Sequence, residues 1–456
     1  MNIMFSDRVN LNKKKHFIVF LIIAFIVYIL FGYIRPYEQD ESQYIIAGKA
    51  ILNGELNPFK VDYYKHYSNP FQFIISSPLA PLIYGLSYDL GGIFLVRFIA
   101  GLFVVLSLLL VYMTIRKLNG DPTLPLILIA FSSSSIVLAS TGLLDSIALF
   151  FLMFSIYLIY SNRPFFAGLL SGLAMTSKFI LIIPILFILI YQFFTKNFFR
   201  YILGVLALII PFLILYRELI PVLITFLMVA KVHSVSIVSL RNFGRLFLIY
   251  LPIVSILNLF YIKSKKIKGY RMLFVPAISI IIFQIAMLDY DSLIRHLPYA
   301  EFPAAILMGL ILKDKKIRFA SFIAIVCIAA GIGFAIGDVI NYPSYNLIRN
   351  DLSIVNGKVL ALNYNSFILI KNLPIHSTAE NVFSYYYFNY DGIPGSDIKE
   401  YERALNNSFF DYATVPSYSS NKFTRFKTIE NLVRKYYCPV LKSNGSNGID
   451  IYKKCH

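Results

Sequence analysis

The sequence predicts a polytopic α-helical membrane protein with about eleven transmembrane helices, followed by a small extracytoplasmic α/β domain. Of its residues, 58% are hydrophobic and only 14% are charged, whereas a soluble domain carries about 25% charged residues. Apolar runs long enough to cross a bilayer recur from Phe17 to Ile340. Beyond Asn341 the chain is polar and rich in Tyr, without such a run. We therefore expect a membrane domain at 1–340 and a second domain at 341–456.

The apolar runs place the expected transmembrane helices in order. The first run follows Lys13–Lys15, as in a signal peptide, but no small-residue cleavage site comes after it, so we expect it to be retained. Residues 165–194 can also be interpreted as one long span, which would invert the topology downstream, and an added span at 220–230 would restore it. The expected spans lie near 17–34, 92–115, 123–140, 146–160, 165–177, 179–194, 201–219, 246–262, 272–288, 297–312 and 317–339.

The net charge of +18 comes largely from Lys and Arg in the loops on one side of these spans. Basic loops stay in the cytoplasm, so we expect a multi-pass protein of the cell membrane with a cytoplasmic N-terminus and an extracytoplasmic C-terminal domain. Because this placement explains the charge, we expect no nucleic-acid partner, only membrane lipids around the helices.

The polar C-terminal segment has the pattern of a small α/β domain. Residues 359–364, 411–415 and 448–453 read as strands and 428–437 as a helix. Cys438 and Cys455 lie in this segment, and on the extracytoplasmic side they can form a disulfide. Two free thiols are the alternative.

Ionisable residues gather at the extracytoplasmic ends of the expected spans. Asp40 and Glu41 open the first extracytoplasmic loop, 35–91, and five further residues lie near later span ends: Arg97, Asp145, Lys178, Arg295 and His296. Each has a plain alternative. Arg97 and Lys178 can snorkel to headgroups, Asp145 can cap a helix, and His296 can pack. Their collection on one leaflet favours a functional site.

An acid pair beside cations at a membrane surface indicates a definite chemistry. Asp40 and Glu41 can deprotonate a hydroxyl or hold a divalent metal such as Mg²⁺ or Mn²⁺. Lys and Arg can stabilise a phosphate as a ligand or as a leaving group. A sugar donor with a lipid-phosphate carrier would place its reactive end at this level.

The order of several segments resembles the glycosyltransferase C (GT-C) superfamily, in the branch of protein O-mannosyltransferases and the lipid A aminoarabinose transferase. The likeness covers residues 17–312. It is carried by Asp40-Glu41, the Gly-containing segment 47–59, the proline-marked 77–85, 94–102, the acidic segment 144–151, the glycine-rich 167–178 and the Arg-His-x-Pro segment 295–303.

The resemblance implies a polyprenyl-phosphate-dependent, inverting glycosyltransferase, of hexosyl, pentosyl or mannosyl type. It carries the catalytic base onto Asp40, with Glu41 beside it, and the second acidic motif onto Asp145, so these three are the expected catalytic residues. Lys178, Arg295, Arg97 and His296 are the candidates for binding the lipid phosphate or sugar. The acceptor would be a glycan, a lipid or a protein. A transporter or lipid-linked-sugar flippase is the alternative, although the charges cluster at one end rather than through the bilayer.

Overall fold

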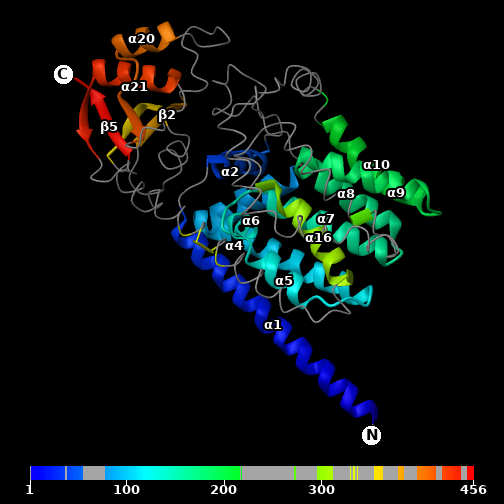
Figure 1. Ribbon diagram of the computed structural model, residues 1–456. Helices are drawn as coiled ribbons and strands as arrows, with labels where there is room; N and C mark the ends of the chain where they lie inside the picture. The colour runs from blue at the N-terminus through cyan, green and yellow to red at the C-terminus, as the bar shows by residue number, and fades with distance from the viewer. Residues whose placement is uncertain are drawn as a thin grey trace. The chain divides into compact units, whose positions relative to one another are not determined.

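The computed structural model forms two compact units (Figure 1). The first comprises Met1–Tyr33, Leu90–Arg217 and Val229–Ile336, and the second comprises Ile34–Asp89, Glu218–Met228 and Gly337–His456. The expected span at 246–262, most of the spans at 272–288 and 317–339, and the alternative span at 220–230 lie outside the described residues. The structure describes residues 2–35, 39–54, 78–215, 217, 272–273, 295–311, 329, 332–333, 336, 354–362, 378–384, 398–416, 424–442 and 449–455.

The first unit is helical. The helices among its described residues are α1 (Asn2–Ile34), α4 (Leu79–Lys117, which begins in the second unit), α5 (Thr123–Ala130), α6 (Ser133–Ala139), α7 (Leu144–Tyr160), α8 (Pro164–Ser177), η3 (Phe179–Leu181), α9 (Ile182–Phe193), α10 (Phe198–Leu215) and α16 (Pro298–Ile311). Within the described residues, α1, α4 and α10 are long and apolar enough to cross a membrane, and α6 with α7 can form one bent span.

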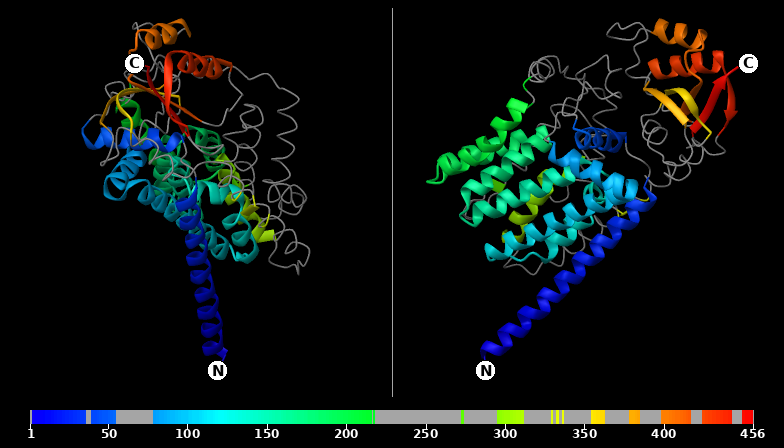
Figure 2. Two further views of the ribbon diagram at one scale, coloured as in Figure 1. Left: turned by 90° about the vertical axis from the view of Figure 1, so that its left-hand side faces the viewer. Right: turned by 180° about the vertical axis from the view of Figure 1, so that it is seen from behind.

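Helix α1 shows how these helices face lipid and protein. It is one unbroken helix in both views of Figure 2. Ala24 and Tyr28 are buried, and the Tyr28 hydroxyl donates to the Ala130 carbonyl at 2.7 Å. On the other face Ile22 and Leu30 are more than half exposed. Because lipid tails are as apolar as these side chains, such a face is stable in a bilayer.

The expected continuous span at 123–140 is wrong, because two short helices, α5 and α6, occupy it. The chain is extended at Ser132, whose side chain accepts a hydrogen bond from the Ser135 amide and caps α6. Serine favours such caps over helix interiors, so the serine run interrupts the helix. Helix α6 then meets α7 at an angle of 112°.

The alternative of one long span at 165–194 is also wrong. Helix α8 ends at Ser177, and Lys178 has extended backbone angles (φ −150°, ψ 112°) before η3 and α9 begin. Two separate helices are therefore present, and Lys178 lies at the break between them.

Glycines allow α8 and α10 to pack side by side (Figure 1). A Cβ atom at Gly168 would clash with the Tyr201 carbonyl oxygen, and one at Gly204 with that of Phe165. The hydroxyls of Ser155, Ser171 and Tyr201 form a buried chain of 2.7 Å hydrogen bonds in the same region. The glycine-rich segment therefore serves close helix packing.

In the second unit, α2 (Gln39–Leu52) packs closely against the start of α4. A Cβ atom at Gly48 would clash with the Pro81 carbonyl oxygen, and one at Gly85 with the backbone of Gly48. An ion pair of 2.9 Å between Lys49 and Asp89 joins the same helices. Because Asp40 and Glu41 lie in the first turns of α2, this packing fixes their backbone.

The end of the chain forms a five-stranded sheet in the order β2-β1-β3-β5-β4. Strand β1 pairs in parallel with β2 and β3, and β5 pairs antiparallel with β3 and β4. Three expected strands correspond to β1, β3 and β5, and the expected helix to α21, whereas β2, β4 and α20 were not expected. The bounds are β1 (Asn356–Ala361), β2 (Thr378–Ser384), α20 (Ile398–Asn406), β3 (Tyr412–Pro416), α21 (Thr424–Tyr436), β4 (Tyr437–Leu441) and β5 (Ile449–Lys454).

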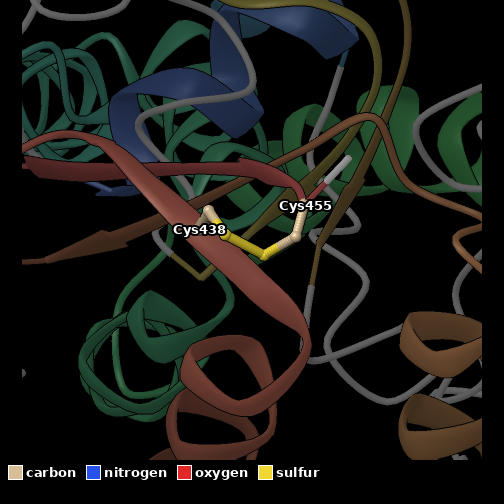
Figure 3. Close-up of a disulfide and its surroundings, with 2 residues drawn as sticks. All are labelled: Cys438 and Cys455. Atoms are coloured by element: carbon tan, nitrogen blue, oxygen red, sulfur yellow. A yellow bond between two sulfur atoms is a disulfide. The ribbon is translucent and has the colours of Figure 1, made fainter.

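Apolar side chains and a disulfide hold this sheet together. Tyr401 and Val433 of the helices pack with Leu360 of β1 in a buried core. Cys438 of β4 and Cys455, just after β5, form a disulfide with their Cα atoms 5.1 Å apart (Figure 3). The alternative of two free thiols at Cys438 and Cys455 is therefore wrong. The side of the membrane on which the sheet lies stays a prediction.

Candidate active site

Asp145 lies in the first turn of α7, directly after the bend between α6 and α7, and its side chain is fully buried. The sequence allowed a helix cap at this position. The cap residue is Leu143, however, and no side chain caps this helix end. The Asp145 carboxylate binds other side chains instead.

Three side chains from two other elements converge on this carboxylate. Lys178 Nζ lies 3.0 Å from Asp145 Oδ2, and His296 Nε2 lies 3.4 Å from Oδ1. The Tyr299 hydroxyl donates to Oδ1 at 2.9 Å. Lys178 comes from the break after α8, whereas Tyr299 lies in the first turn of α16 and His296 lies two residues before that helix. We call Asp145, Lys178, His296 and Tyr299 the carboxylate cluster.

The surroundings of the cluster are cationic. The charge of Arg295 also acts on Asp145, and the rings of His296 and Tyr299 stack at 6.0 Å. A buried carboxylate is costly to desolvate unless charges and hydrogen bonds compensate it. The cluster therefore ties α7, α8 and α16 together and holds the cations in fixed positions.

Lys178 is the member of this ion pair that reaches the surface. Its side chain is 19% exposed, whereas that of Asp145 is fully buried. A partly exposed ammonium group beside a buried carboxylate is a cation that an anion can approach from the exposed side. Chemically, the arrangement can bind a phosphate at the edge of the cluster.

Sequence reasoning missed a second buried carboxylate, Glu301 of α16. Its Oε2 accepts hydrogen bonds from Ser134 at 2.5 Å and from Ser132 at 3.1 Å. Since Ser132 caps α6, Glu301 holds α16 against the break between α5 and α6. An acid inside an apolar run was the available signal. Tyr299 carried no comparable signal, because tyrosine is common in such segments.

Arg97 lies elsewhere in the first unit. It is only 3% exposed, and its Nη1 donates to the Gly32 carbonyl at 2.8 Å. This contact joins α4 to the end of α1, so the snorkelling alternative for Arg97 is wrong. Its expected role in phosphate binding stays a prediction.

The acid pair of the first loop is only partly described. Glu41 is fully buried, and the side chain of Asp40 lies outside the described residues, although its backbone belongs to α2. No group of three or more His, Cys, Asp or Glu residues within the described part of the chain could hold a metal ion. A metal shared by Asp40 and Glu41 therefore stays a prediction.

Comparison with known proteins identifies the fold. No protein-family model and no curated protein matches the sequence. Among solved structures, ArnT from Cupriavidus metallidurans in the apo state is similar, with a TM-score of 0.66 and 13% identity over 96% of this chain and 98% of that chain. The same protein bound to undecaprenyl phosphate has a TM-score of 0.61 at the same identity and coverage.

The similarity to ArnT extends over nearly the whole of both chains, so this chain has the ArnT fold. Together with its apolar helices, the fold makes it a polytopic helical membrane protein. The resemblance inferred from the sequence is confirmed at the level of the fold.

Proposed function

We propose that the protein is an integral-membrane glycosyltransferase that moves a sugar from a polyprenyl-phosphate carrier to an acceptor at the extracytoplasmic face. The observation that carries this proposal is the buried carboxylate cluster, which holds Lys178 at 3.0 Å from Asp145 in a chain with the GT-C fold. A similar structure binds undecaprenyl phosphate, a lipid carrier of the proposed class.

The proposed roles follow from burial and charge. Lys178 and Arg295 neutralise the phosphate of the donor, and His296 lies beside them. Asp145 is a positioning residue, because a fully buried carboxylate that accepts from Lys178 and Tyr299 holds those groups rather than contacting substrate. Arg97 supports the end of α1.

Asp40 is the proposed general base, and the buried Glu41 orients α2 around it. The Asp40 carboxylate takes the proton of the acceptor hydroxyl, whose oxygen forms a bond to the anomeric carbon of the sugar. The bond from that carbon to the phosphate oxygen breaks, and its electron pair leaves with the polyprenyl phosphate. Direct displacement inverts the anomeric configuration. The cations stabilise the departing phosphate.

The proposal also covers the sugar, the acceptor and a metal ion. The sugar is a hexose or pentose, with mannose-like donors as the first candidates. The acceptor is a glycan, a lipid or a protein side chain. If Mg²⁺ or Mn²⁺ takes part, Asp40 and Glu41 are the residues that would hold it.

The test is mass spectrometry of the purified protein incubated with a panel of polyprenyl-phosphate sugars and candidate acceptors. We expect sugar-dependent release of polyprenyl phosphate by the wild type and no release by Asp40→Asn, because the amide cannot take the proton. Glu402→Gln is the matched control, since Glu402 is an exposed acid of the same unit that belongs to α20 rather than to α2 or α4. It should release product normally.

The outcomes separate the proposal from its rival. Full turnover by Asp40→Asn would remove Asp40 as the base. Binding of an intact donor, with its movement across vesicle membranes and no transfer to any acceptor, would favour a flippase. Sugar-dependent release by the wild type alone would establish the transferase and identify its donor.

A further inference from the structure

A cavity of about 680 Å³ lies where α1, the C-terminal end of α4 and the turn into α5 meet. This volume is within the range of small-molecule sites. The cavity lies away from the Gly32–Arg97 contact. Tyr112 is fifteen residues beyond Arg97, which corresponds to about 22 Å along an α-helix. The lining residues used below are His16, Phe17, Phe20, Tyr112, Arg116 and Asp121.

The cavity lies at the level where both helices pass from apolar to basic sequence. The apolar window of α1 begins at Lys15, and α4 ends in Arg116 and Lys117. Basic residues at the ends of transmembrane helices lie among lipid headgroups. A ligand in this cavity would therefore be most accessible from the headgroup layer.

Two opposite charges line the cavity without pairing. Arg116 is exposed, and no described residue forms an ion pair with it. Asp121 uses Oδ1 to accept from the Thr123 amide at 3.0 Å and from its hydroxyl at 2.8 Å. Within the described part of the chain, Oδ2 accepts no hydrogen bond. Among the described residues, the cavity thus offers the Arg116 cation and the Asp121 Oδ2 oxygen to one ligand.

The remaining wall is aromatic. The rings of Phe17 and Tyr112 stack at 3.7 Å with an interplanar angle of 12°, and Phe20 meets Phe131 edge to face at 6.1 Å. These rings join α1 to α4 and α5 and give the cavity an apolar surface. Charged groups of both signs above an apolar wall are complementary to a zwitterion attached to hydrocarbon.

We propose that this cavity binds the headgroup of a membrane phospholipid with a primary ammonium, the chemistry of phosphatidylethanolamine. Arg116 and His16 bind the phosphate, and Asp121 accepts from the ammonium. The first part of the lipid tail lies along Phe17 and Tyr112. A choline headgroup has no N–H to donate to Asp121, and a glycerol headgroup has no cation.

Native mass spectrometry of the full chain in detergent tests the proposal with phosphatidylethanolamine, phosphatidylcholine and phosphatidylglycerol of the same acyl chains. We expect the wild type to retain phosphatidylethanolamine about two- to fivefold better than either other lipid, the range for one exposed charge interaction. Asp121→Asn should abolish this preference. Its amide oxygen can still accept from Thr123, so the start of α5 is preserved.

Arg116→Ala should weaken binding of all three lipids by a similar factor. Arg200→Ala is the matched control, because Arg200 is an exposed Arg in the first turn of α10 and does not line the cavity. Equal retention of the ethanolamine and choline lipids by the wild type would overturn the proposal. So would an unchanged preference in Asp121→Asn. Stronger retention of phosphatidylglycerol would show a simple anion site instead.

Discussion

Two Lys–carboxylate pairs of almost equal length show how differently the two units use charge. Lys178 and Asp145 are 3.0 Å apart, with side chains 19% and 0% exposed. Lys435 of α21 and Glu402 of α20 are 3.2 Å apart, with side chains 60% and 44% exposed. Exposed pairs contribute about 0–1 kcal/mol because water and salt screen them. Removing one partner of a buried pair costs about 3–5 kcal/mol, because it leaves an uncompensated charge.

The comparison indicates that burial rather than distance decides what an ion pair does. Burying the carboxylate cluster around Asp145 carries a large desolvation cost. We therefore interpret the cluster as a device that holds its cations in position rather than as a source of stability. The exposed pair between α20 and α21 can be lost with little consequence for stability. There the apolar core around Leu360 and Val433 and the disulfide supply the stability.

The largest expected effect comes from Asp145→Ala. It leaves Lys178 and the other cationic groups without their shared carboxylate, and we expect a loss of about 3–5 kcal/mol. Thermal unfolding of the detergent-solubilised protein measures it, with Glu402→Ala as the matched control. Equal shifts in melting temperature for the two variants would refute the contrast between the units.

Removal of the disulfide should rank second. The bond joins residues 17 apart in sequence, and closing a loop of this length contributes about 3 kcal/mol. We expect Cys438→Ser with Cys455→Ser to raise hydrogen exchange in β4 and β5 while α7 and α8 keep theirs. Cys327→Ser controls for the loss of a thiol outside the sheet. Unchanged exchange in β4 and β5 would show that the apolar core suffices.

Lys178→Ala is expected to weaken donor binding by about tenfold or more, since hydrogen bonds to charged groups contribute about 1.5–3 kcal/mol. The change also removes a partner of the buried Asp145, so we expect a lower melting temperature as well, and donor affinity is compared at a temperature where both proteins are folded. Titration with a polyprenyl-phosphate sugar measures the affinity, and Lys435→Ala should leave it unchanged. Unaltered donor affinity in Lys178→Ala would return this residue to a purely structural role.

The smallest expected effect is a pH dependence of the exposed pair. Hydrogen bonds from Lys435 and Tyr436 lower the pKa of Glu402 below its ordinary value of 4.5. A carboxyl group whose pKa is lowered in the folded state stabilises the fold at pH values above 4.5. This stabilisation is lost as the pH falls from 4.5 through the lowered pKa. Glu402→Gln should therefore speed hydrogen exchange in α20 slightly at pH 7, and the difference from the wild type should shrink progressively as the pH falls below 4.5. A difference that grows in acid would contradict this sign.

Much of the fold followed from local pattern. Apolar runs of span length predicted α1, the later part of α4 and the helices from α7 to α10, because a membrane requires continuous apolar helix, whereas α2 and the start of α4 lie in the expected loop 35–91. The errors occurred where local chemistry competes with periodicity. Ser132 interrupts the expected span at 123–140 by capping α6. Strand β2 and helix α20 escaped prediction because their segments are short and polar.

The sequence by itself determined that Asp145, Lys178 and His296 would lie near one end of the helices, since charges are excluded from the apolar runs. Only the tertiary structure decided that they share one carboxylate. Asp145 and Tyr299 are 154 residues apart, and the bend of 112° between α6 and α7 directs Asp145 toward both α8 and α16. Local sequence encodes periodicity and caps. The partners of a buried charge depend on which helices pack together, and close glycine contacts and buried hydrogen bonds between distant segments decide that packing.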